Sequence, residues 1–153
     1  MDTTVLSAKL LRVVAAAEEM LRRVSAAESA TPALAGGWSR RQVIGHLIDS
    51  ASNNHQRFVR ASLQDSLEFP AYDQNGWSRV QAVDEAEWPL LVALWANYNR
   101  YLAHLISHFP PAKLATPIRV GEDEPITLGF LAEDYLRHLT HHLRQIGAAP
   151  AGD

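Results

Sequence analysis

Apolar residues recur at three- and four-residue steps along four long stretches of the chain, which is the period of an α-helix with one buried side. The stretches run from about Val5 to Ala27, from residue 40 to 63, from Asp84 to Phe109 and from Leu128 to Ile146. No alternation of apolar and polar residues is long enough to build a sheet. The pattern therefore predicts an all-α protein, and four such helices favour a four-helix bundle.

Residues that break or cap helices separate these stretches. The segment from Thr31 to Gly37 contains Pro32 and ends in two glycines, so it should end the first helix. Ser39 is a suitable N-cap for the second helix, and Thr127 for the fourth. These signals place the helix boundaries close to the limits of the apolar pattern.

Two long connections are expected between the later helices. Residues 64–83 join the second helix to the third and contain Pro70 and the turn signal Asn75–Gly76. A further connection precedes the fourth helix, and within it Ile118 to Ile126 could form a small hairpin around Gly121. Long loops in compact domains often carry function.

Composition narrows the class of protein. With 153 residues, of which 47% are hydrophobic, the chain should form one domain over residues 1–153. A net charge of −3 leaves no positive excess for nucleic acid or an anionic membrane, so neither is an expected partner. The absence of cysteine excludes disulfides, thiolate metal sites and a cysteine nucleophile. No apolar run is long enough to cross a bilayer, and Asp2 does not suit a signal peptide, so we expect a cytoplasmic protein.

Histidine is the unusual residue, with seven in the chain. His138 and His142 are four residues apart on the inner flank of the fourth helix, which is the spacing that two imidazoles need to hold one metal ion. His104 and His108 have the same spacing, but they lie opposite the apolar side of the third helix and are expected to be an exposed pair. His141 points away from the apolar stripe and should lie at the surface or beside the ligands.

The second helix carries a line of polar residues beside its apolar side, which is typical of a cavity wall. The line consists of His46, Ser50, Asn53 and Arg57. His46 could supply a third metal ligand, and Asp49 could accept the other ring N–H of His46 and so fix its tautomer. His55 lies on a different side and should be exposed. The residues alone leave open that His46, His138 and His142 are isolated polar residues of the bundle, since an i,i+4 histidine pair is only a moderate metal signal.

Several short strings, spread over most of the chain, share a pattern with one known family. They are His46-Leu47-Ile48-Asp49-Ser50, then Asn53 and Arg57-Phe58, then Pro70-Ala71-Tyr72-Asp73 with Trp77, and Tyr135 before His138 and His142. This pattern resembles the DinB-like/YfiT-like superfamily. The resemblance implies a four-helix bundle that binds a divalent metal, commonly nickel or zinc, through His46, His138 and His142. It also places Asp49, Asn53, Arg57 and Tyr72 beside that centre or in its pocket.

The resemblance also implies a range of activities. Characterised branches of the family attach low-molecular-weight thiols such as bacillithiol, mycothiol or glutathione to electrophilic substrates, and others carry provisional assignments as metal-dependent hydrolases. In the YfiT-like pattern a Trp precedes the first histidine of the H-x-x-x-H pair and a Gly follows it. This chain has Arg137 and Leu139 on either side of His138, and that difference counts against the bacillithiol branch.

We therefore expect a metal-dependent enzyme that transfers a small thiol to an electrophilic small molecule. In this interpretation three neutral imidazoles leave an open metal position, and Arg57 meets the charged remainder of the thiol. The alternatives are a metal-dependent hydrolase of an amide or ester, and a metal-binding stress protein without turnover. A homodimer through helix faces is a further expectation, drawn from the resemblance and from the 4 tryptophans.

Overall fold

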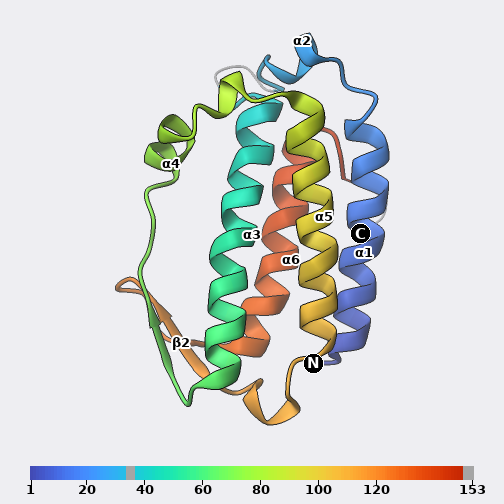
Figure 1. Cartoon of the computed structure of the whole chain (residues 1–153). Coiled ribbons are helices and arrows are strands. Elements are labelled where there is room, and N and C mark those ends of the chain that lie inside the picture. Colours follow the sequence, from blue (N-terminus) through green and yellow to red (C-terminus); the bar gives the residue numbers. More distant parts are fainter. Residues whose placement is uncertain (34–36, 150–153) are drawn as a thin grey trace.

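Four long helices dominate the computed structural model, which describes residues 1–33 and 37–149 (Figure 1). They are α1 (Thr3–Leu21), α3 (Arg40–Leu63), α5 (Trp88–Ser107) and α6 (Leu128–Gln145). Each corresponds to one of the four predicted stretches. The all-α bundle predicted from the apolar period is therefore confirmed.

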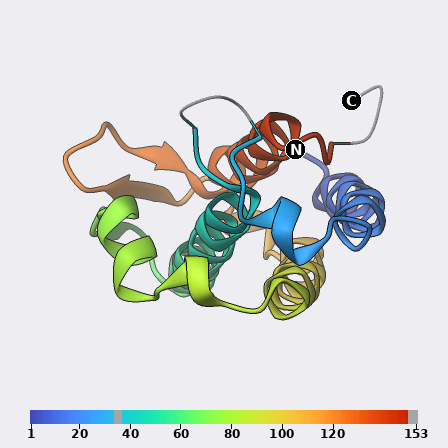
Figure 2. The same cartoon turned by 90° about the horizontal axis from the view of Figure 1, so that it is seen from above.

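The order of the helices in space differs from a simple up-and-down bundle. α1 packs against α5, α5 also packs against α3, and α3 packs against α6. The colour gradient in Figure 1 shows α3 and α5 running in the same direction, with α1 and α6 running in the opposite one. Because two parallel neighbours cannot be joined by a short turn, residues 64–87 carry the chain back along the length of the bundle. Seen from above, this connection lies on the side of the bundle away from α1 (Figure 2).

The helix caps agree with the sequence. The Ser39 side chain accepts from the backbone N–H of Gln42, and the Gln42 side chain accepts from the backbone N–H of Ser39. Thr127 accepts from the backbone N–H of Phe130 at 3.2 Å. The two bonds at Ser39 and the one at Thr127 satisfy backbone N–H groups that have no partner within the first turn of a helix. Both predicted helix N-termini are therefore confirmed.

Two helix boundaries differ from the prediction. The first helix ends at Leu21 instead of Ala27, because Ser25 caps a separate short helix, α2 (Ala26–Ser29). The third begins at Trp88 instead of Asp84, because the 3₁₀ turn η1 (Val83–Glu85) precedes it. Of the predicted break at 31–37, residues 34–36 lie outside the described part of the chain.

The expectation of no sheet is corrected. Within the described residues, β1 (Leu67–Phe69), β2 (Pro117–Val120) and β3 (Ile126–Thr127) form a three-stranded sheet in that order. β2 and β3 are the predicted hairpin, with Ile118 paired to Ile126. β1 pairs in parallel with β2, and its three residues are too few for a period to show in the sequence.

Short helices also occupy parts of the expected loops. α4 (Gln74–Val80), capped by the Asp73 side chain, lies in the connection before α5, and the 3₁₀ turn η2 (Pro111–Lys113) follows α5. α4 and the sheet both lie against the side of α3 that faces away from α1 (Figure 2). They therefore give this helix a second covered side, which the four-helix pattern did not predict.

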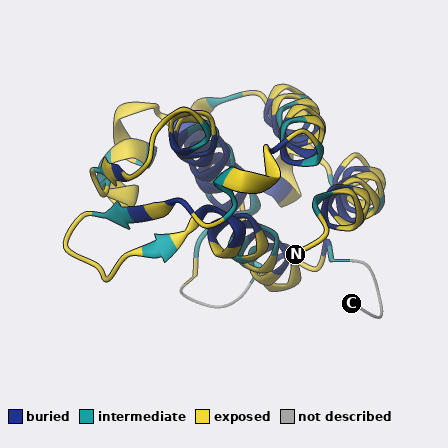
Figure 3. Cartoon of the chain, turned by 90° about the horizontal axis from the view of Figure 1, so that it is seen from below, coloured by how far each residue is buried: buried dark blue, intermediate teal, exposed yellow. Residues whose placement is uncertain are grey.

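The core lies between the four long helices, where their inner sides are buried and their outer sides exposed (Figure 3). Trp95 and Phe58 are among the largest fully buried side chains. The Tyr135 ring packs edge-on against Phe58, and the Tyr135 hydroxyl donates to Asn99 Oδ1 at 2.6 Å. None of the helices in the described residues has both the length and the apolar character required to span a membrane.

Candidate metal centre

Three histidines from two packed helices converge at one point. His46 extends from α3, and His138 and His142 extend from α6. One ring nitrogen from each lies within 4.8 Å of the others, and Nε2 of His46 is 3.2 Å from Nε2 of His138. Two nitrogens that each bind one ion at about 2.0–2.1 Å lie about 2.8 to 3.4 Å apart at octahedral or tetrahedral angles. The separation of His46 and His138 therefore fits a shared metal ion, and a ring nitrogen of His142 lies within 4.8 Å of both.

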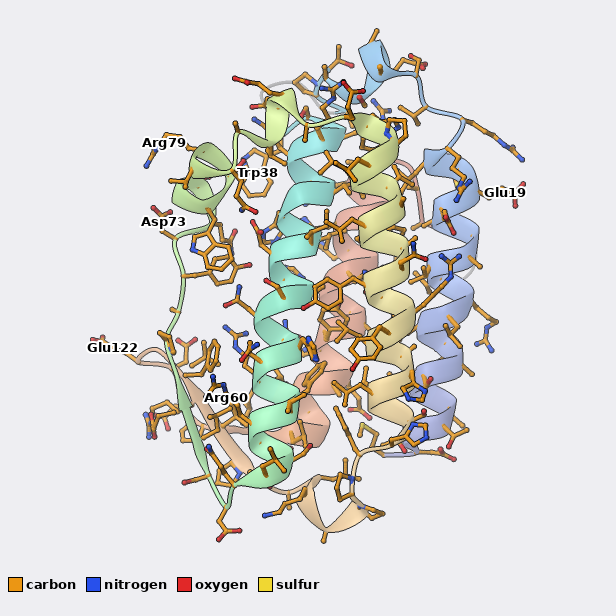
Figure 4. The ribbon with its side chains drawn as sticks, in the orientation of Figure 1. Glu19, Trp38, Arg60, Asp73, Arg79 and Glu122 are labelled. Atoms are coloured by element: carbon orange, nitrogen blue, oxygen red, sulfur yellow. The ribbon has the colours of Figure 1, made fainter. Side chains whose placement is uncertain are left out.

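Local structure explains this convergence. His138 and His142 are one helical turn apart, so both project from the side of α6 that packs against α3. The Trp38 ring, just before α3, meets the His46 ring edge-on, with centroids 5.4 Å apart. Figure 4 shows Trp38 beside the first turns of α3. Trp38 thus shields His46 on one side, a contact that the sequence did not indicate.

Burial determines the charge of these rings. Burial, with repulsion from the neighbouring histidines, lowers the pKa of His46 to about 4. Burial likewise lowers the pKa of His138 to about 4, and it lowers that of His142. All three imidazoles are therefore neutral at pH 7. Their lone pairs are free to bind a metal without a competing proton.

The metal-free protein should lose stability in acid between about pH 6.5 and 4. The unfolded chain protonates histidine near pH 6.5, whereas folded His46 and His138 resist protonation down to about pH 4. In that window the unfolded state binds more protons, so the free energy of unfolding falls as pH falls, by up to about 1.4 kcal/mol per pH unit per histidine. The contribution of half-buried His138 should be smaller.

Urea unfolding of metal-free protein at pH 7, 6 and 5 measures this slope. The His46→Gln variant lacks one of the titrating groups, so its stability should depend less steeply on pH. An identical slope in the variant and the parent protein would contradict the argument.

The other ring nitrogens have different surroundings. Nδ1 of His46 and Nδ1 of His138 are buried and have no hydrogen-bond partner among the described residues. The expected bond from His46 to Asp49 is therefore not formed. Asp49 instead accepts from Nε2 of Gln81 at 3.0 and 3.2 Å, because its side chain faces the end of α4.

Gln145 orients the third ring. Its amide oxygen lies 2.8 Å from Nδ1 of His142, so that nitrogen must carry the proton and Nε2 keeps its lone pair. The amide nitrogen of Gln145 faces Nε2 of His141 at 3.0 Å. His141 is exposed, as expected. Sequence reasoning missed Gln145, although its position three residues after His142 on one helix is a signal that could have identified it.

Replacing Gln145 with leucine should weaken metal binding about 10-fold, because the partners that orient ligating histidines contribute about 10- to 100-fold to affinity. The measurement is competition against a coloured chelator. Gln56→Leu is the matched control, since Gln56 is an exposed glutamine on α3 that bonds only to Arg60 among the described residues. Equal affinity in the Gln145 variant and the control would show that Gln145 does not position the ligand.

A cavity of about 240 Å³ opens beside His46 and His138. Its walls come from α3, α6, β2, the segment before α4 and the first residue of α4. Of the polar residues expected around the centre, Arg57 and Tyr72 line this cavity. Tyr72 packs against Trp77 with ring centroids 4.9 Å apart, and burial raises its pKa to about 12, so its hydroxyl stays protonated.

Asn53 and Asp49 do not line this cavity. The Asn53 amide donates to the backbone oxygen of Asp49 at 2.9 Å, and Asn53 lines a separate hollow beside Phe69 and Trp77. Its neighbour Asn54, the residue that interrupts the apolar side of the second helix, lines the cavity instead.

The remaining histidines lie apart from the centre. His104 near the end of α5 and His108 at its C-cap are both exposed, as expected, with ring centroids 4.3 Å apart. His55 was expected to be exposed but is half-buried. Its Nδ1 lies 3.1 Å from the Tyr98 hydroxyl, because α5 packs against this side of α3.

Comparisons of sequence place the chain among known proteins. A family model described as the DinB superfamily matches residues 9–146. A Bacillus pumilus protein with a provisional assignment as a metal-dependent hydrolase is 26% identical over 132 residues, which is 84% of this chain and 74% of that protein. YfiT of Bacillus subtilis, with the same provisional assignment, is 31% identical over 120 residues, or 76% of this chain and 66% of YfiT. The chain thus spans about two thirds to three quarters of these relatives.

Two solved structures share the fold. The structure of Bacillus subtilis YfiT, described as an unusual four-helix bundle, aligns with a TM-score of 0.79 and 24% identity over 92% of this chain and 83% of YfiT. A mycothiol-dependent maleylpyruvate isomerase aligns with a TM-score of 0.75 and 15% identity over 95% of this chain and 60% of the isomerase. At these identities the likeness shows the fold alone.

Proposed function

Because this chain belongs to the DinB superfamily, we propose that it is a divalent-metal-dependent enzyme that transfers a low-molecular-weight thiol to an electrophilic small molecule. The observation that carries the proposal is the group of three neutral histidines, His46, His138 and His142, of which His46 and His138 line a cavity of about 240 Å³. A divalent ion held by these nitrogens supplies positive charge, which lowers the pKa of a thiol or water bound to it. Nickel and zinc both suit a site built from imidazoles.

The other polar groups of the cavity favour a thiol over water as the nucleophile. Some metal-dependent hydrolases, such as the H-E-x-x-H metalloproteases, also use a carboxylate as general base. Among the described residues that line the cavity, Asp134 is the one carboxylate, and it is paired with Arg137. A thiol that has already lost its proton needs no such base.

The chain's own residues prepare the site for an anionic nucleophile. Three neutral imidazoles add no negative charge, so a thiolate meets no repulsion from the ligands. Tyr72 keeps its proton and can donate a hydrogen bond into the cavity. The chain contains no cysteine, so no thiol of its own competes for the ion or for the electrophile.

A hydrolase of amides or esters is the second candidate, because curated relatives carry that provisional assignment. The deciding experiment uses the metal-loaded protein. Glutathione, mycothiol and bacillithiol are each supplied with a model electrophile, and model esters and amides are supplied without thiol. Thiol-dependent loss of the electrophile supports the transferase. Hydrolysis without thiol assigns the hydrolase, and no turnover in either assay assigns a binding protein.

A further inference from the structure

Arg57 is a buried cation that has no counter-ion among the described residues. It is 8% exposed, it lines the cavity beside the histidines, and its Nε has no hydrogen-bond partner in the described structure. Its guanidinium lies over the Phe69 ring, 5.1 Å from the ring centroid, and no described carboxylate lies within ion-pair distance. Burying an unpaired charge is costly, and a negatively charged ligand would offset that cost.

Asn54 is a second buried polar side chain in the same cavity that lacks a hydrogen-bond partner for one of its atoms within the described residues. It is 6% exposed, and its Nδ2 donates to the backbone oxygen of Ser50 at 2.9 Å. Because a carbonyl oxygen only accepts, this bond requires the amide nitrogen to face Ser50. The amide oxygen is then left buried, with no hydrogen-bond partner in the part of the chain that the structure describes. It could accept a hydrogen bond from an N–H or O–H group of a ligand.

These groups lie on one line with the candidate metal centre. His46, Ser50, Asn54 and Arg57 follow one another at steps of four, four and three residues on α3, so all four line the cavity. Eleven residues separate His46 from Arg57, a rise of about 16 Å along the helix, and side chains on a helix lean back towards its N-terminus. That general direction agrees with the presence of Arg57 and His46 in the wall of the same cavity.

We propose that Arg57 and Asn54 form a subsite for the carboxylate end of the ligand whose other end reaches the histidines. Arg57 pairs with the carboxylate, and Asn54 Oδ1 accepts from an N–H group next to it. Identifying that ligand as the thiol rests on the proposed function. A peptide-like thiol of the glutathione type has a carboxylate beside an amide N–H, whereas a thiol that ends in an uncharged sugar has no carboxylate for Arg57.

The experiment uses a probe without a free thiol and a protein without metal. S-methylglutathione is titrated into the metal-free protein and followed by NMR, with the Arg57 Nε–H signal as a local reporter. Arg57→Gln should weaken binding about 10-fold or more, since a charge-assisted hydrogen bond is worth roughly 1.5–3 kcal/mol. Arg57→Lys, which keeps the charge but not the planar fork, should restore part of the affinity.

Two controls isolate the subsite. Arg60→Gln makes the same change of charge at an exposed arginine one turn further along α3, labelled in Figure 4, and should leave binding unchanged. The diethyl ester of S-methylglutathione lacks both carboxylates, so it should bind weakly to the parent protein and to Arg57→Gln alike. Arg57→Gln removes a buried charge that has no counter-ion among the described residues, but it also removes the contact with the Phe69 ring. These effects oppose each other, so the free energy of unfolding should change little, whereas replacing a purely structural arginine would lower it clearly.

Maleate, a small unsaturated dicarboxylate, is titrated as a second probe to identify the source of the carboxylate. A response to S-methylglutathione that depends on Arg57 assigns the subsite to the thiol, and such a response to maleate alone assigns it to the electrophile.

The proposed subsite is overturned if Arg57→Gln binds both probes as the parent protein does, if Arg60→Gln weakens binding equally, or if the ester binds as tightly as the acid. Without thiol or metal in the assay, the result is independent of transferase activity.

Discussion

His138→Ala should abolish stoichiometric metal binding while leaving the helical fold in place. The substitution removes the imidazole whose Nε2 lies 3.2 Å from Nε2 of His46, and the two remaining histidines then offer too few ligands for a stable centre. We expect the affinity to fall by at least about 100-fold, given the large free energy of metal binding by a complete ligand set. Because His138 is half-buried and its Nδ1 has no partner among the described residues, the loss of its ring should cost the fold little.

Metal analysis of tag-free protein, with circular dichroism on the same samples, measures both parts of this prediction. His104→Ala is the matched control, because His104 belongs to a pair with the same spacing on the exposed side of α5. It should keep its full metal content. If His138→Ala retained one ion per chain, the assignment would be wrong, and loss of metal from His104→Ala would place the ion at the exposed pair.

Much of the fold follows from residues that act locally. The apolar period identifies α1, α3, α5 and α6, and Ser39 and Thr127 mark two of their N-termini through side-chain caps that need no tertiary context. β1 is different, because Leu67–Phe69 forms a strand only by pairing with Pro117–Val120, about fifty residues further along the chain. A pairing of that kind leaves no period in the sequence.

The candidate centre was predictable to the level of helix faces. His138 and His142 share a side of α6 by spacing alone, and the apolar stripe indicates that this side faces inward. Whether His46 meets them depends on the antiparallel packing of α3 on α6, which is tertiary. The family resemblance supplied that pairing, and the structure brings one ring nitrogen of each histidine within 4.8 Å of the others.

The cavity wall was predicted less well, because α3 is covered on two sides. Asn53 and Asn54 differ by about 100° around the helix axis. Helical phase alone favoured Asn53, but the segment before α4 covers that part of α3 and leaves Asn54 facing the cavity. Asp49 was similarly diverted from His46, because Gln81 at the end of α4 supplies it with a donor. The position of α4 therefore decides which polar residues reach the site.

Thiol consumption by the metal-loaded protein should vanish on treatment with a chelator and should rise with pH through the ionisation of the bound thiol. A free cysteine-type thiol has a pKa near 8.5, and a positively charged site lowers it, so the midpoint of the rise should lie well below 8.5. The histidines do not produce this rise. The pKa values of His46 and His138 are about 4, so these rings stay unprotonated and keep their metal across pH 6 to 9.

Turnover and metal content measured on the same samples from pH 5 to 9 separate the two effects. Between pH 6 and 9 the activity should change while the metal content stays constant, and below about pH 5 both should fall as protons compete for the imidazoles. Activity that follows metal content at every pH would show that ligand protonation, and not thiol ionisation, sets the profile. Activity that persists after chelation and dialysis would separate the chemistry from the three histidines altogether.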